Sequence, residues 1–185
     1  ALDADKVGVD VYEVLEAGKD SYPRFDIPNP GFSQGPCLTK DPSIYAKAFV
    51  GHHLFEKAAH VNTNSFNYKL WTTVGNTRLH DRVGLIGAAF KADPPTSDTR
   101  NSPLSELRRV FDIDPYYYDP AVEGTLPEYA DVWKNMDVVV VGTELAKKHN
   151  LPPLIELMKP TGLVVDFWNT WPDLKSPQYK VFGRP

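Results

Sequence analysis

The chain has 185 residues, a formal net charge of −4, and 42% hydrophobic, 24% charged and 12% aromatic residues. These values are normal for a soluble globular protein and exclude disordered, collagen-like and coiled-coil chains. No run of Lys and Arg is longer than a doublet, so we expect no nucleic-acid partner. The longest apolar stretch, Val138 to Val141, is far shorter than the roughly 20 residues of a membrane span, so we expect no membrane partner.

The first part of the chain is predicted to be helical. Residues 1–19 form two short helices around a turn at Gly8, because their apolar residues recur at helical spacing. The proline-rich segment from Ser21 to Pro36 lacks periodicity and is predicted to be a long loop. Asp41 followed by Pro42 is typical of a helix start, so we expect the next helix to begin there.

A second apolar series runs at near-helical spacing from Phe55 to Val74 and ends at Gly75, which is suited to cap a helix. Such a long helix is more than a small domain needs, and we expect it to contribute to a subunit interface.

The rest of the chain alternates β-rich runs with helical segments. Strands are predicted at 82–87, 116–118, 137–141 and 163–167, and helices at 102–111, 126–134 and 154–158. The first of these helices opens with Ser102 and Pro103 and is expected to bury four apolar residues: Leu104, Leu107, Val110 and Phe111. This alternation predicts an α/β fold, with a Rossmann-like parallel sheet flanked by helices and preceded by a helical arm.

Cys37 is the only cysteine of the chain and lies just ahead of the helix predicted to start at Asp41. The positive end of that helix and the nearby Lys40 would both favour the thiolate, which is the nucleophilic form. A lone cysteine can equally be a small buried hydrophobic residue. Asp41 can be a helix cap alone or also orient a water, and Lys40 can serve a site or be a solvated surface lysine. A single cysteine cannot form an intramolecular disulfide, which fits a reducing compartment or says nothing about the compartment.

The polar segment from Gly87 to Pro103 joins the end of a predicted strand to the start of a helix. Ligands bind at this place in open α/β sheets, and Lys91 and Arg100 would suit a phosphate or diphosphate. An ordinary polar loop is the other interpretation. Gly84-Leu-Ile-Gly87 is not a GxGxxG fingerprint, so the chain lacks a complete dinucleotide motif.

Other residues are predicted to be structural. His52, His53 and His60 lack the i, i+4 spacing that lets two imidazoles share a metal, so we predict no metal site. The tyrosines at 116–118 and the tryptophans at 133, 168 and 171 are interpreted as packing residues rather than a base-stacking surface.

Four segments together resemble the UDP-glucose/GDP-mannose dehydrogenase family in order and spacing. They are Pro30 to Pro42, Gly87 to Asp93 with Asp98 to Pro103, Tyr118 to Pro120, and Asp137 to Thr143. Members of this family have an N-terminal Rossmann domain for NAD, a central helical region that forms the dimer, and a C-terminal Rossmann-like domain for the nucleotide of the substrate. The resemblance implies that residues 1–78 end the central helical and dimerisation region, and that residues 79–185 form the UDP-sugar-binding domain.

The resemblance implies part of an NAD-dependent dehydrogenase that oxidises the C6 alcohol of a UDP-sugar to a uronate through a cysteine thioester. Cys37 would be the nucleophile, and Asp41 would orient the water that hydrolyses the thioester. Lys40 and Arg100 would contact the NAD cofactor. The substrate contacts would be Phe32, Gly35, Phe90 and Lys91.

The same resemblance implies a cytoplasmic homodimer that supplies a uronic acid for surface polysaccharide. The family's NAD domain would lie upstream of residue 1, so we do not expect this chain alone to turn over substrate. Where many members have Asp-x-Arg-Asn, this chain reads Asp166-Phe-Trp-Asn169. The alternatives are a stand-alone nucleotide-binding or scaffolding module, a GDP-mannose dehydrogenase, and a Cys-dependent hydrolase.

Overall fold

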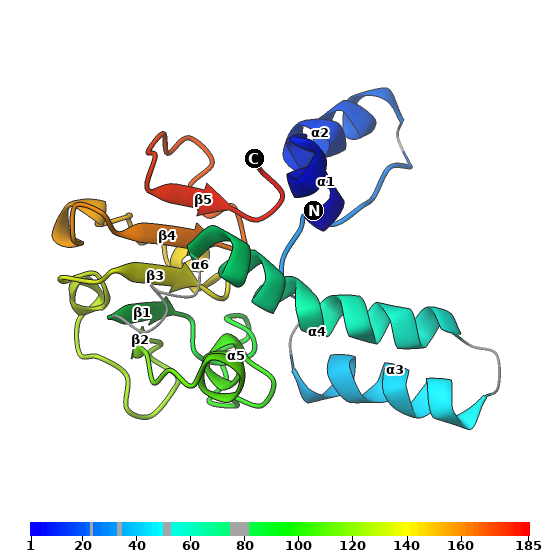
Figure 1. Cartoon of the computed structure of the whole chain (residues 1–185), viewed down its shortest axis with the longest axis horizontal. Coiled ribbons are helices and arrows are strands. Elements are labelled where there is room, and N and C mark those ends of the chain that lie inside the picture. Colours follow the sequence, from blue (N-terminus) through cyan, green and yellow to red (C-terminus); the bar gives the residue numbers. More distant parts are fainter. Residues whose placement is uncertain (23, 33–34, 50–52, 75–81) are drawn as a thin grey trace.

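The structure, a computed structural model, describes residues 1–22, 24–32, 35–49, 53–74 and 82–185. It consists of a helical arm and hairpin next to a parallel sheet (Figure 1). The helices are α1 (Leu2–Val7), α2 (Val11–Ser21), α3 (Pro36–Ala48), α4 (His53–Val74), α5 (Pro103–Phe111) and α6 (Leu145–Lys148), with 3₁₀ turns η1 (Tyr129–Val132) and η2 (Ile155–Leu157). The strands are β1 (Val83–Ile86), β2 (Tyr116–Tyr118), β3 (Val138–Val141), β4 (Leu163–Asp166) and β5 (Tyr179–Val181).

The five strands form one all-parallel sheet in the order β2-β1-β3-β4-β5. Every residue of β1 and β3 is buried, as expected for central strands covered on both faces. Buried residues of α4 and α5 pack on one face of the sheet, while those of η1 and α6 pack on the other, so the predicted Rossmann-like α/β class is confirmed. Because β2 and β3 lie on opposite sides of β1, the strand order reverses between β1 and β3, which is where such sheets bind ligands.

The long helix predicted from the apolar series is α4. Phe66, Leu70 and Val74 near its C-terminal end are buried against the sheet. Its other half packs against α3, and the two form a hairpin that extends away from the sheet (Figure 1). The predicted cap at Gly75 lies outside the described residues. Large apolar side chains stay exposed on this hairpin: Leu38, Ile44, Tyr45, Phe49, Leu54, Phe55, Val61, Tyr68 and Trp71.

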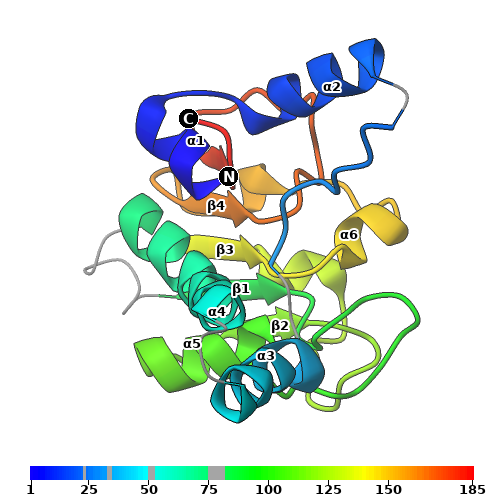
Figure 2. The ribbon, with the colours of Figure 1, turned by 90° about the vertical axis from the view of Figure 1, so that its right-hand side faces the viewer.

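The two short helices predicted for the arm are confirmed as α1 and α2. Gly8 ends α1 in the left-handed region at φ 73°, which glycine adopts without strain. The Tyr12 hydroxyl of α2 donates to the carbonyl of Phe182 at 3.1 Å, which joins the arm to the C-terminal segment. Lys69 Nζ of α4 lies 2.9 Å from Asp5 Oδ2 of α1, so the arm also bonds to the long helix. The two chain ends consequently lie near each other in both views (Figures 1 and 2).

The predicted start of α3 at Asp41 and Pro42 is wrong. The helix begins at Pro36, after Gly35 with φ 95° and ψ 162°, and Pro42 lies inside it. Pro36 occupies the first helical position, where the missing N–H of proline removes no helical bond. Cys37 therefore lies in the first turn of α3 rather than ahead of it.

Three further predictions need correction. The segments 126–134 and 154–158 form only the 3₁₀ turns η1 and η2, because Pro127, Pro153 and Pro160 restrict regular helix in or beside them. The short α6 and β5 were not predicted. Val110 is 41% exposed: it follows the buried Glu106 and Leu107 on the same side of α5, but it lies in the last turn, where the helix ends at Phe111.

Candidate functional site

The loop after β1 carries two predicted site residues to the carboxyl edge of the sheet. The backbone N–H groups of Ala88 and Ala89 donate to Asp119 Oδ2 at 2.9 and 3.0 Å, and Asp119 is itself buried. Farther along, the N–H of Phe90 donates to the carbonyl of Asp98 at 3.0 Å. These bonds fix the loop, so that Phe90 and the following Lys91 stand at the reversal point of the sheet.

The proline-rich loop before α3 meets this same place. The N–H of Gly35 donates to the carbonyl of Asn101 at 3.2 Å. A Cβ atom added at Gly35 would lie 2.8 Å from a ring carbon of Phe90, and its φ of 95° also favours glycine. The structure therefore brings the predicted residues Gly35 and Phe90 into contact.

Cys37 is exposed, so its interpretation as a buried hydrophobic residue is wrong. Asp41 follows one turn later on the same face of α3, because residues four apart are neighbours on a helix. Both line a groove of about 390 Å³. The other residues of this groove are Leu38, Pro42, Tyr45 and Phe55.

Arg100 lies within electrostatic reach of Cys37. Its guanidinium pairs mainly with Asp98, with Nη2 2.6 Å from Oδ2 and Nε 3.0 Å from Oδ1. These hydrogen bonds are the main cause that raises the pKa of Arg100, and Coulombic interactions with Asp98 and, to a smaller extent, with Cys37 add to it. The same bonds lower the pKa of Asp98 to about 2. Lys40 pairs with Asp41 at 3.4 Å, and both side chains are more than half exposed (62% and 61%).

A second hollow, of about 360 Å³, lies at the carboxyl ends of β1, β3 and β4. It shares Leu38 with the groove that contains Cys37, so the two spaces adjoin. The residues that line it are Phe32, Leu38, Phe90, Lys91, Ala92, Asp93, Thr143, Glu144 and Trp168. Three of the predicted substrate residues, Phe32, Phe90 and Lys91, thus come together here. We call this hollow the aromatic pocket.

Sequence reasoning noted that Trp168 stands where many members of the family have arginine, but it interpreted the residue as packing and did not assign it to this pocket. The available signal was its position directly after a predicted strand, since strand ends in parallel sheets line the ligand edge. The turn after β4 is held by Asp166, which is fully buried. Burial raises the pKa of this carboxyl, while hydrogen bonds led by the one from Tyr179 oppose the rise.

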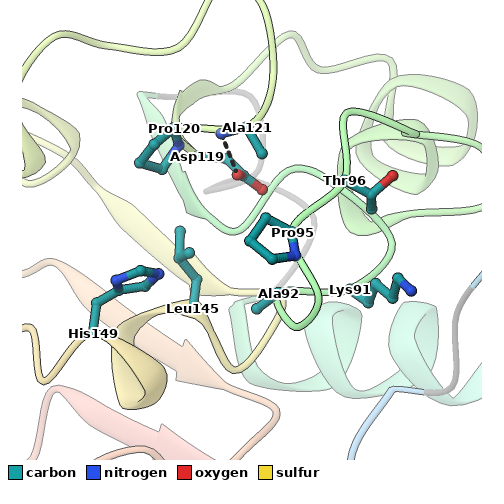
Figure 3. A pocket seen from close by; sticks show the side chains of 9 residues that line it. All are labelled: Lys91, Ala92, Pro95, Thr96, Asp119, Pro120, Ala121, Leu145 and His149. Carbon is teal, nitrogen blue, oxygen red and sulfur yellow. Dashed lines mark hydrogen bonds between the residues drawn. The ribbon is translucent and has the colours of Figure 1, made fainter.

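A third hollow, of about 230 Å³, adjoins the aromatic pocket, because Lys91 and Ala92 line both. Figure 3 shows the residues that line this third hollow. Its remaining lining residues are Pro95, Thr96, Asp119, Pro120, Ala121, Leu145 and His149. The Asp119 carboxylate accepts the N–H of Ala121 at 3.2 Å in this pocket, and Lys91 extends away from His149 (Figure 3).

The described parts of the chain contain no group of three His, Cys, Asp or Glu side chains placed to hold a metal ion. Of the histidines considered above, His52 lies outside these parts. Among the helices that the structure describes, none combines the length and apolar character needed to cross a membrane.

Several solved structures of nucleotide-sugar dehydrogenases share the fold of this chain. A UDP-D-ManNAc dehydrogenase from Pyrococcus horikoshii is 26% identical with a TM-score of 0.76, and the match covers 99% of this chain and 46% of that one. A GDP-mannose dehydrogenase from Pseudomonas aeruginosa is 25% identical with a TM-score of 0.62, covering 97% of this chain and 47% of that one. A UDP-glucose dehydrogenase from Pyrobaculum islandicum shares the fold at 20% identity and a TM-score of 0.67, covering 97% of this chain and 45% of that one.

The chain thus spans about half the length of the solved structures that it matches. No family model matches the sequence. No curated protein matches it either. The resemblance to the UDP-glucose/GDP-mannose dehydrogenases seen in the sequence motifs is confirmed by these structural matches.

Proposed function

From this resemblance, we propose that the chain is the nucleophile-bearing and nucleotide-binding part of an NAD-dependent dehydrogenase. The enzyme would oxidise the C6 alcohol of a UDP-sugar to a uronate. One observation carries this proposal: Cys37 and Asp41 line a groove that adjoins the aromatic pocket through Leu38. The reacting end of a nucleotide sugar can lie in the groove while the rest of the substrate occupies the pocket.

The chemistry of Cys37 follows from its place in the first turn of α3. Its thiolate adds to the aldehyde carbon at C6 and forms a carbon–sulfur bond, which commits the substrate to a covalent intermediate. After oxidation to the thioester, a water adds to the acyl carbon and Cys37 leaves as the thiolate. Asp41 lies one helical turn away and accepts the proton of that water.

NAD would supply the hydride acceptors for both two-electron oxidations, of the C6 alcohol to the aldehyde and of the cysteine adduct to the thioester. The residues of this chain do not fit a dinucleotide on their own, since Gly84-Leu-Ile-Gly87 in and after β1 is not a GxGxxG sequence. A Cβ atom at Gly87 would lie 1.8 Å from Thr143 Oγ1, so this glycine serves close packing against Thr143. We propose that NAD is bound mainly by a part of the enzyme outside these residues, with Lys40 and Arg100 as the contacts from this chain.

We propose residues 1–78 as the end of a central helical region and residues 79–185 as the UDP-sugar-binding domain. The exposed apolar side chains of the α3–α4 hairpin, such as Phe49, Leu54 and Val61, support a homodimer formed there. We further propose that the enzyme works in the cytoplasm and supplies a uronic acid for surface polysaccharide.

Substitution of Cys37 tests the proposed chemistry in the complete enzyme. Cys37→Ala should abolish uronate formation while UDP-sugar binding remains, because only the covalent step is lost. Lys47→Ala, an exposed change on the same helix, is the matched control and should leave the rate unchanged. Uronate formation by the Cys37→Ala enzyme at the rate of the control would refute the thioester mechanism.

Thermal unfolding of the chain with UDP, GDP and NADH tests the nucleotide class. A ligand at about 100 times its Kd stabilises the folded state by about 2.7 kcal/mol, which raises Tm by several degrees. We expect UDP alone to raise Tm. If GDP but not UDP raised Tm, the substrate would be a GDP-sugar rather than a UDP-sugar.

A further inference from the structure

Trp168 is held rigidly at the wall of the aromatic pocket. Its indole Nε1 donates to the carbonyl of Gly142 at 2.9 Å, and its backbone N–H donates to Asp166 Oδ1 at 2.8 Å. Because the only polar atom of the side chain already has a partner, the ring can offer a ligand nothing but its aromatic surface.

The buried carboxylate of Asp166 also fixes the rest of the turn that carries Trp168. It accepts the backbone N–H of Thr170 at 2.6 Å and the Thr170 hydroxyl at 3.2 Å. The hydroxyl of Tyr179 on β5 donates to Asp166 Oδ2 at 2.6 Å. This network fixes the short turn that follows β4, and the fixed turn sets the orientation of the indole ring.

The proline-rich loop closes on the ring from another side. A Cβ atom added at Gly31 would lie 2.6 to 2.9 Å from three carbons of the Trp168 ring. These distances are shorter than any ordinary carbon–carbon contact, so the backbone of the loop lies directly against the indole. The ring is therefore held between the loop and the end of β4.

The position of Trp168 relative to Cys37 decides which part of a substrate it meets, and this step rests on the proposed function. Trp168 lines the aromatic pocket but not the adjoining groove of Cys37. The carbon that reacts must reach Cys37, so the sugar lies toward the groove. The nucleotide then extends into the pocket toward Trp168.

The charges of the aromatic pocket favour stacking over ionic attraction. Lys91 is the only cation among its nine lining residues, and Asp93 and Glu144 are acidic. Asp93 is paired with Lys148 at 3.3 Å, and Lys91 Nζ stands 5.5 Å from the centre of the Phe90 ring. One lysine can hold one phosphate, so charge alone does not account for the binding of a nucleoside diphosphate in this pocket.

We propose that Trp168 is the stacking platform for the base of the nucleotide and is thereby a specificity-determining residue of this site. The pocket then selects its ligand by a flat aromatic base, with Lys91 contacting the phosphate. A sugar phosphate without a base gains nothing from Trp168.

The test measures binding of UDP and of glucose 1-phosphate, which lacks a base, to the chain and to two variants. Trp168→Ala should weaken the binding of UDP by about 5- to 150-fold, the range that corresponds to stacking of one base on an aromatic ring. It should leave the affinity for glucose 1-phosphate unchanged. Trp168→Phe keeps a stacking ring and should bind UDP nearly as the unsubstituted chain does.

Tryptophan fluorescence supplies a second readout that does not depend on the alanine variant being folded. UDP should quench the fluorescence of the chain, and Trp168→Phe should remove most of the quenching while calorimetry still detects UDP binding. Trp71→Phe, at an exposed position on α4, is the control and should keep the quenching.

Three results would overturn the proposal. The first is that the chain does not bind UDP, the second is that a folded Trp168→Ala variant binds UDP as tightly as the unsubstituted chain, and the third is that the variant loses as much affinity for glucose 1-phosphate as for UDP. None of these measurements involves Cys37 or uronate formation. Failure of the stacking proposal is therefore separate from failure of the proposed oxidation, which the Cys37→Ala enzyme reports.

Discussion

Substitution of Gly31 by alanine tests the placement of Trp168 with a single methyl group. The φ of Gly31 lies outside the left-handed region, so alanine meets no backbone penalty there. The new methyl carbon would lie 2.6 Å from the nearest ring carbon, whereas such contacts are normally about 3.5–4.0 Å. The ring or the loop must therefore move by about 1 Å.

The expected loss of stability combines three contributions. Overpacking of this kind costs about 1–3 kcal/mol. A movement of this size also stretches the bond between Trp168 Nε1 and the Gly142 carbonyl, now 2.9 Å, and a lost hydrogen bond costs about 1 kcal/mol. Alanine recovers about 0.4–1 kcal/mol by restricting the unfolded chain. The net loss is about 1–3.6 kcal/mol, or a Tm lower by roughly 2–14 °C for a chain of this length.

Thermal unfolding followed by circular dichroism measures this loss in a double-mutant cycle. In the Trp168→Ala background the ring is absent, so Gly31→Ala should be neutral or slightly stabilising. The Gly31→Ala chain should also bind UDP more weakly, since its indole is displaced. An unchanged Tm for Gly31→Ala, or the same loss in both backgrounds, would show that the indole does not lie against this glycine.

Three other predictions concern the arm, the loop after β1 and the nucleophile. Lys69→Met should lower the free energy of unfolding by about 3–5 kcal/mol in denaturant titrations, because it leaves Asp5 largely buried (14% exposed) without its ionic partner. Adding Asp5→Leu should restore most of the loss, and a double variant as unstable as the single one would contradict this account. The pKa of Asp98 is lowered in the folded chain, so the Asp98–Arg100 pair contributes stability above about pH 4 that is lost as the pH falls toward 2. An NMR titration should place this carboxyl near pH 2, and a midpoint near 4 would argue against the pair. Because Cys37 is the only cysteine, the mass of the alkylated chain reports its reactivity alone. A UDP-sugar should slow its alkylation by iodoacetamide, and equal rates with and without the sugar nucleotide would place the substrate elsewhere.

Much of the α/β half could be predicted because its signals are local. The run Val138 to Val141 has the composition of a buried strand, and Ser102 with Pro103 starts α5 with both a side-chain cap and a proline at the first position. The left-handed turn at Gly8 is equally local. Each of these patterns lies within a few residues, so the sequence alone determines the element.

The site depends on contacts between distant segments, and there the sequence alone was not sufficient. Pro36 and Pro42 are both locally suited to start a helix, and the structure has the helix begin at the first. Gly35, next to that start, is in contact with Phe90 and hydrogen-bonded to Asn101, neither of which is near in sequence.

Trp168 shows the same limit. Its sequence neighbours fit a packing residue, and only the sheet order places the end of β4 beside the ends of β1 and β3. The pocket, its adjoining groove and the rigid indole between Gly31 and Gly142 arise from that order. Short-range patterns thus determined the elements, while the meeting of strand ends and loops, which only the folded chain can bring about, decided which side chains form the site.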